Sequence, residues 1–124
     1  MRYLIDTNCC IYLFAGTHPL LAQRISDTSA GEIGLSTVVL AEFAFGLQRS
    51  GGLPDERLDS LIEQMPVQPF DQRAAEAYAR LPFRRGRFDR LLAAHALSRG
   101  LILITNNPRD FADIPDLAVE NWTL

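Results

Sequence analysis

The sequence has 124 residues, a net charge of −3 and 48% hydrophobic residues, which suits one domain with a substantial core. No apolar run approaches the roughly 18 residues that span a bilayer, and the apolar stretch before the first acid is too short for a signal peptide, so we expect a cytoplasmic protein. All 12 basic residues are arginine, and lysine is absent.

The two cysteines, Cys9 and Cys10, are neighbours in the sequence. Adjacent cysteines form a disulfide with each other only under strain, and the chain has no third cysteine, so we expect no disulfide framework. The pair is expected to act as two small apolar residues at the start of a helix.

Short apolar runs alternate with segments of helical periodicity. The runs that predict strands lie at 3–5, 33–35, 67–70, 101–104 and near 117–119. Apolar residues at helical spacing predict helices at 8–14, 18–26, 36–48, 54–65, 71–78 and 88–98. Ser36 and Asp71 are expected to cap two of these helices, Pro54 to lie in the first turn of another, and Gly100 to end the last one in the left-handed conformation.

This alternation predicts an α/β fold in which residues 1–124 form one domain, with a parallel sheet covered by helices on both faces. The runs 3–5 and 101–104 are the most apolar, so we expect them to be central and adjacent strands. In such folds, sites form beyond the carboxyl ends of the strands. Asp6 follows the first of these runs, and Thr105 and Asn107 follow the second.

Two acids stand out because apolar residues precede or surround them. Asp6 directly follows the first apolar run, where it is either a helix cap or a functional carboxylate; Thr7 and Asn8 can also cap, so Asp6 is not required for capping. Glu42 lies within the apolar stretch 38–45, where a charge is costly unless it is paired, bound to a metal or directed to solvent. A functional role and a solvated helix face are both open for Glu42.

Two further acids occur near predicted helix starts. Asp89 begins the helix 88–98, where an acid also complements the helix dipole. Asp110 is either a cap for the next turn or a fourth carboxylate. His95 follows Asp89 by six positions and faces another side of the helix, so we expect a partly buried, hydrogen-bonded histidine rather than a metal ligand.

Five segments in order resemble the VapC-type toxins of the PIN-domain family. These segments are YLIDTN (3–8), AEFAFG (41–46), FDRLLAAHAL (88–97), LITNNPRDF (103–111) and VENW (119–122). The resemblance covers essentially the whole chain. It implies a three-layer α/β/α sandwich around a central parallel sheet, endoribonuclease activity that depends on Mg²⁺ or Mn²⁺, homodimerisation, and neutralisation by a cognate VapB-type antitoxin. We expect the tail of that antitoxin to block the carboxylate pocket with an arginine.

Asp6, Glu42 and Asp89 match the three most recurrent acids of this family. The fourth acid has two candidate positions, Asn107 and Asp110, and we favour Asp110, with Asn107 as a neutral neighbour that contacts water or substrate. Thr105 is expected to orient one of the carboxylates by a hydrogen bond. The loop before Asp89 is shorter than in many members of the family, which places an arginine cluster beside the site.

The chemistry of RNA cleavage suits this set of acids. Phosphodiester cleavage requires an activated water and a neutralised leaving group, and Mg²⁺ provides both while preferring oxygen ligands. We expect Asp6 and Asp89 to be the most direct ligands. Glu42 and Asp110 would bind through water, hold a second metal or orient the attacking water.

An acidic site repels RNA, and the arginine cluster can offset this by contacting phosphates. Its members are Arg80, Arg84, Arg85, Arg87 and Arg90. The same cluster also suits a solvated face or a contact with an acidic partner. Single-stranded or looped RNA is the expected substrate, since a compact pocket cannot read a stiff duplex.

Other classes of function fit the sequence less well. A phosphoacceptor receiver domain and a haloacid-dehalogenase-type phosphatase both place an Asp after the first strand, but both also require a lysine, which this chain lacks. A PIN fold that has lost catalysis and acts only as a binding module is the remaining alternative. The retention of all four acids disfavours it.

Overall fold

The protein is described by a computed structural model that covers residues 1–52, 55–83 and 87–124. Its strands form one sheet in the order β3-β2-β1-β4-β5, and all the pairings are parallel. The strands are β1 (Tyr3–Ile5), β2 (Ile33–Ser36), β3 (Val67–Gln68), β4 (Ile102–Ile104) and β5 (Val119–Glu120).

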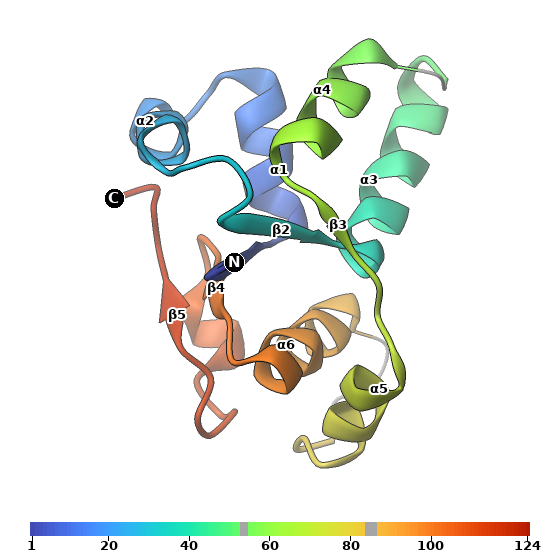
Figure 1. Cartoon of the computed structure of the whole chain (residues 1–124), viewed down its shortest axis with the longest axis vertical. Helices are drawn as coiled ribbons and strands as arrows, with labels where there is room; N and C mark the ends of the chain where they lie inside the picture. The colour runs from blue at the N-terminus through green and yellow to red at the C-terminus, as the bar shows by residue number, and fades with distance from the viewer. Residues whose placement is uncertain (53–54, 84–86) are drawn as a thin grey trace.

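Helices cover both faces of this sheet, as Figure 1 shows. One layer holds α1 (Thr7–Ala15), α2 (Pro19–Asp27), α3 (Thr37–Ser50) and α4 (Glu56–Gln64). The opposite layer holds α5 (Gln72–Ala79) and α6 (Phe88–Arg99), and a short 3₁₀ helix, η1 (Pro108–Phe111), follows β4. The predicted α/β/α sandwich with a central parallel sheet is therefore confirmed.

The two strands predicted to be central are adjacent. Tyr3 pairs with Ile102 and Ile5 with Ile104, so β1 and β4 run in register. Leu4, Ile5 and Leu103 have no exposed surface. Because both strands end at the same edge of the sheet, the residues after Ile5 and Ile104 are brought together there.

Side chains cap the helices that leave this edge. The Asp6 carboxylate accepts a hydrogen bond from the Cys9 amide at 2.8 Å and is the N-cap of α1. The expectation that Asp6 is not needed for capping is therefore wrong, because Thr7 is already the first helical residue. Ser36 and Asp71 cap α3 and α5 as predicted.

Several boundaries differ from those predicted. Strand β3 stops at Gln68 rather than at residue 70, and β5 begins at Val119, later than the predicted run. Asp55 caps α4 and Glu56 begins it, whereas Pro54, which was expected in the first turn, lies outside the described residues. The Asp55 side chain accepts a hydrogen bond from the Arg57 amide at 2.9 Å and so marks the start of α4.

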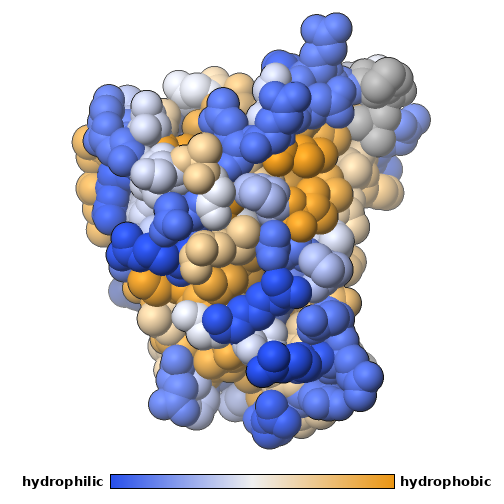
Figure 2. All heavy atoms as spheres, in the orientation of Figure 1, coloured by the Kyte–Doolittle hydropathy of each residue, from blue (hydrophilic) through white to orange (hydrophobic). Residues whose placement is uncertain are grey.

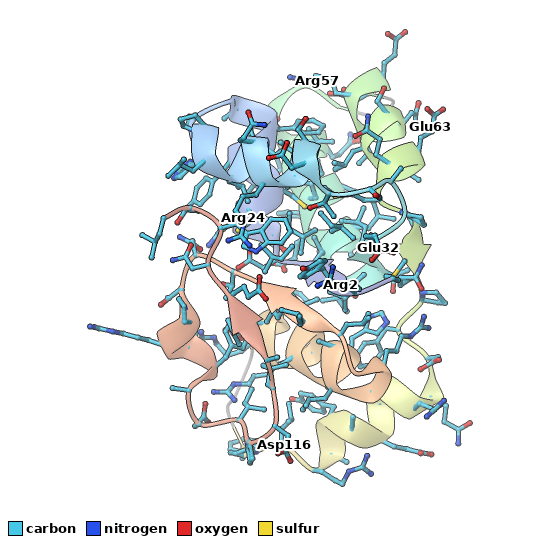
Figure 3. All side chains as sticks on the ribbon, turned by 60° about the vertical axis from the view of Figure 1, so that its left-hand side comes forward. Arg2, Arg24, Glu32, Arg57, Glu63 and Asp116 are labelled. Carbon is cyan, nitrogen blue, oxygen red and sulfur yellow. The ribbon has the colours of Figure 1, made fainter. Side chains whose placement is uncertain are left out.

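The C-terminal segment closes one end of the sheet. Trp122 is almost fully buried and its ring meets that of Tyr3 edge to face, with the centroids 5.0 Å apart. Arg24 of α2, labelled in Figure 3, lies 4.5 Å from the centroid of the Trp122 ring and 3.4 Å from a carboxylate oxygen of Glu120 in β5. The last strand is therefore tied to the α1–α4 layer.

Polar and apolar residues divide between surface and core. In the view of Figure 2 hydrophilic residues dominate the outer surface, and hydrophobic residues show between α3 and α4. Cys9 and Cys10 are free and fully buried, as expected, and burial raises the pKa of both thiols. Within the described ranges, none of the helices has the length and apolar character needed to cross a bilayer.

Candidate metal centre

A pocket of about 290 Å³ opens where β1 and β4 end. Four acids line it, and each comes from a different segment: Asp6 after β1, Glu42 in α3, Asp89 in α6 and Asp110 in η1. The fold therefore gathers all four acids that the sequence singled out. Thr105, Asn107 and Arg87 line the same pocket.

Asp6 is the most buried of these acids, with 9% of its surface exposed. One carboxylate oxygen, Oδ1, is held by the Cys9 amide at the start of α1. This bond fixes the carboxylate relative to both the helix and the strand. Capping and lining the pocket are thus compatible roles of one side chain.

Glu42 is oriented from the neighbouring helix. The Thr7 hydroxyl in α1 donates a hydrogen bond of 2.8 Å to Oε1 of Glu42 in α3. This bond does not involve the second carboxylate oxygen of Glu42, so that oxygen can still accept a hydrogen bond or bind a cation. The expectation of a solvated outer face for Glu42 does not describe this geometry.

Asp89 and Asp110 share one guanidinium. Arg87 Nη2 lies 2.6 Å from Oδ2 of Asp89, and Arg87 Nε lies 3.2 Å from Oδ1 of the same carboxylate. The same Nη2 lies 3.2 Å from Oδ2 of Asp110. These contacts raise the pKa of Arg87, so its positive charge is retained.

The polar residues after β4 form hydrogen bonds that differ from those predicted. The Thr105 hydroxyl accepts a hydrogen bond from the Asn107 amide at 3.1 Å, and no carboxylate bonds to it within the described ranges. Thr105 therefore shapes the turn, and Thr7 does for Glu42 what was expected of Thr105. The side-chain Nδ2 of Asn106 donates a hydrogen bond to the Tyr12 hydroxyl. The buried Oδ1 of Asn106 has no hydrogen-bond partner among the described residues.

The arginine cluster divides into residues with different surroundings. Arg90 is only 2% exposed and its Nη2 bonds Asp113 Oδ1 at 2.7 Å and the Asp110 carbonyl at 3.3 Å. Arg90 is thus buried and cannot contact RNA as expected. Arg84 and Arg85 lie outside the described residues.

His95 is buried on the far side of α6 from the acids. Its Nδ1 is 2.8 Å from the Ser36 hydroxyl, so the predicted hydrogen bond is confirmed, but the side chain is fully rather than partly buried. Burial lowers the pKa of His95 to about 4, with a further lowering from Arg99 and an opposing effect of Asp71. The ring is therefore neutral at pH 7.

The residues of the pocket fit a hard divalent cation. The side-chain oxygens in its lining are those of carboxylates, amides and the hydroxyls of Thr7 and Thr105, and they include Oδ1 of Asn106, which has no partner among the described residues. Among the residues that the structure describes, no three Asp, Glu, His or Cys side chains lie close enough together to coordinate one ion. A hard cation that keeps several waters and takes only one or two carboxylates directly is compatible with this lining.

The sequence profile of the PIN domain matches residues 3–117. The chain belongs to the PIN-domain family. Among relatives of this PIN domain, the tRNA(fMet)-specific endonuclease VapC of Shigella flexneri is 30% identical, with 99% of each chain covered. Ribonuclease VapC1 of Haemophilus influenzae is 31% identical, again over 99% of each chain. The resemblance to VapC-type proteins is therefore confirmed over the whole chain.

Solved structures agree with this PIN domain in fold. A DNA-bound VapBC from Salmonella typhimurium superposes with a TM-score of 0.85 at 27% identity, covering 98% of both chains. VapBC2 from Rickettsia felis, bound to a promoter DNA fragment, gives a TM-score of 0.81 at 27% identity. Both solved structures are described as VapBC proteins.

Sequence reasoning missed two features of this PIN domain, the hydrogen bond between Thr7 and Glu42 and the burial of Arg90. The bond between Thr7 and Glu42 joins residues 35 positions apart, and no local pattern reports it. The burial of Arg90 left a signal, because Arg90 shares a helix face with Ala93 and Ala94, which are fully buried.

Proposed function

We propose that this PIN domain is a metal-dependent endoribonuclease, the toxin of a type II toxin–antitoxin pair. The observation that carries the proposal is the convergence of Asp6, Glu42, Asp89 and Asp110 on one pocket from four segments. Carboxylate oxygens are the ligands that a hard divalent cation prefers, and such a cation supports phosphodiester hydrolysis. The names of the VapC relatives support cleavage of RNA.

Each acid has a distinct part in this proposal. Asp6 and Asp89 would hold Mg²⁺ or Mn²⁺ directly, and the bound cation would acidify water and neutralise phosphate charge. Glu42, fixed by Thr7, accepts a proton from the attacking water or holds that water in position. Asp110 lines the same pocket and shares the Arg87 guanidinium with Asp89, and Asn107 is a neutral residue of the same lining.

A cognate antitoxin would bind the apolar groove next to this pocket. The groove lies between α1 and α3, has a volume of about 360 Å³, and includes Ile11, Phe14, Phe43 and Leu47. Glu42 lines both the groove and the acidic pocket. A partner segment in the groove would therefore reach the carboxylates, which suits the predicted blocking tail. The solved VapBC relatives support such a partner.

The test is cleavage of RNA by the purified chain with Mg²⁺ or Mn²⁺, compared with Asp6→Asn and Asp6→Ala. Initiator tRNA is the first substrate to try, given the name of the Shigella flexneri relative. Both variants should lose activity by about two orders of magnitude or more, since each removes the carboxylate. Asparagine retains the helix cap, whereas alanine also costs about 1 kcal/mol of stability.

Equal cleavage by the wild type and Asp6→Asn would show that the activity comes from a contaminant. The binding-module alternative predicts no cleavage by either protein, together with retained affinity for the partner. Independently, a structure of metal-soaked crystals should show an ion at coordination distance from Asp6 and Asp89. An ion bound elsewhere would refute the ligand assignment and leave the nuclease activity standing.

A further inference from the structure

Arg87 engages half of the acidic pocket. Its guanidinium makes a two-pronged contact with Asp89 and a third contact with Asp110, at 2.6 to 3.2 Å. Two-pronged pairs of this kind are among the stronger charge-assisted contacts in proteins. No bond joins this guanidinium to Asp6 or Glu42 within the described ranges, and their oxygens bond to a backbone amide and a hydroxyl instead.

The contacts of Arg87 compete with a metal for the same atoms. Both oxygens of Asp89 face the guanidinium, so a cation cannot bind this carboxylate unless at least one contact to Arg87 breaks. The side chain of Arg87 is 43% exposed, that of Asp89 is 22% exposed and that of Asp110 is 39% exposed. Because the guanidinium stays in contact with solvent while it pairs, water can replace its contacts, and a divalent ion can compete for the same carboxylate oxygens.

We propose that Arg87 is a resident counter-cation, which leaves Asp89 and Asp110 when a divalent cation binds and then contacts a phosphate of the RNA. The proposal rests on the proposed function of the pocket. It assigns Arg87 two partners in succession, first the carboxylates and then the substrate. The guanidinium can serve both because carboxylate and phosphate present similar paired oxygens.

A merely structural role for Arg87 makes the opposite forecast. If the guanidinium only held η1 against the start of α6, its removal would misplace Asp89 and Asp110 and weaken the binding of metal. If Arg87 is a competitor, its removal strengthens the binding of metal. The sign of the change in metal affinity therefore separates the two roles.

The experiment measures Mn²⁺ affinity by calorimetry in the wild type, Arg87→Gln, Arg87→Lys and Arg109→Gln. Arg109 is the matched control, because it lies in η1, is exposed and forms no ion pair within the described part of the chain. Arg87→Gln should bind Mn²⁺ about three- to tenfold more tightly, and Arg109→Gln less than about twofold. Arg87→Lys should fall between the wild type and Arg87→Gln, since lysine keeps the charge but not the two-pronged contact.

The second readout is RNA cleavage as a function of metal and of substrate. In Arg87→Gln the Mn²⁺ concentration for half-maximal activity should fall, while the KM for RNA at saturating Mn²⁺ should rise. Unchanged or weaker Mn²⁺ binding by Arg87→Gln would overturn the inference, as would an equal gain in Arg109→Gln. Absence of Mn²⁺ binding in all four proteins would reject the proposed metal site itself, and the inference with it.

Discussion

At the residue scale, several polar side chains of the pocket fix local structure with one atom and leave another for chemistry. Asp6 caps α1 through one oxygen, and Glu42 accepts from Thr7 through one oxygen. Such bonds hold the carboxylates in place before any ligand arrives. Pre-organisation of this kind lowers the cost of assembling a site.

Replacing Thr7 tests whether the orientation of Glu42 matters. Thr7→Val keeps the shape of the side chain but removes the donor to Glu42, so we expect kcat to fall about tenfold with little change in the free energy of unfolding. Thr7→Ser keeps the hydroxyl and should stay within about twofold of the wild type. Steady-state cleavage assays check this, and equal losses in both variants would contradict it.

His95 gives the stability of the protein a pH dependence. Burial lowers its pKa from 6.5 to about 4, so between these pH values the unfolded chain binds a proton that the folded chain does not. The stabilisation is fully present above pH 6.5 and is lost as the pH falls toward 4, by up to about 3 kcal/mol.

Urea unfolding between pH 4 and 8 measures this contribution. His95→Gln should lose the slope that the wild type shows between pH 4 and 6.5, whatever its overall stability. His18→Gln is the matched control, because His18 is the other histidine of the chain and is partly exposed. An unchanged slope in His95→Gln would assign the pH dependence to the carboxylates instead.

At the scale of elements, the position of η1 depends on a buried arginine. Arg90 in α6 bonds Asp113 and the backbone carbonyl of Asp110, so it joins η1 and the residues after it to the helix that carries Asp89. Its Nε and Nη1 have no partner among the residues that the structure describes. Arg90 therefore supports the position of Asp110 through the hydrogen bonds of its Nη2.

Removing this link should disturb both stability and the site. We expect Arg90→Ala to lower the free energy of unfolding by about 3 kcal/mol and to weaken Mn²⁺ binding, because Asp110 loses its support. Arg80→Ala, at an exposed position, should change stability by less than about 0.5 kcal/mol. Denaturant titration and calorimetry measure the two effects. Wild-type Mn²⁺ affinity in a folded Arg90→Ala protein would contradict the argument.

The sequence predicted elements well where local pattern decides them. The apolar run at β4 and the caps at Ser36 and Asp71 lie where the pattern indicated. Strand β5 was displaced because only two residues pair, and the apolar run before Val119 does not report which residues reach β4. Chain order indicated the four acids, but side-chain contacts such as the Thr7–Glu42 and Arg87–Asp110 pairs depend on tertiary geometry.

At the scale of the whole molecule, apolar residues remain exposed on the α1–α4 layer. Leu20 in α2 is 55% exposed, outside the packed core and outside the groove proposed for the antitoxin. Homodimerisation, predicted from the family resemblance, would cover such side chains. The burial of apolar area is the main source of free energy for an association of this kind.

Light scattering coupled to size exclusion tests the dimer directly. We expect a mass of twice 13.8 kDa for the wild type and a shift toward the monomer in Leu20→Glu, where a charge would be buried in the interface. Tyr78→Glu places the same charge on α5 in the opposite layer and should leave the dimer intact. A monomeric wild type, or dissociation in both variants, would reject the interface on α2.

The pairing of β1 with β4 also determines when during synthesis the pocket can exist. Asp6 is synthesised at the beginning of the chain. Asp89, Asp110 and strand β4, which pairs with β1, come from the last third of the chain. At about 5 to 20 residues per second, translation takes about 6 to 25 s, and for most of that time the carboxylates have no common pocket. A nascent chain that has not yet reached Asp110 therefore lacks part of the pocket that we propose for RNA cleavage.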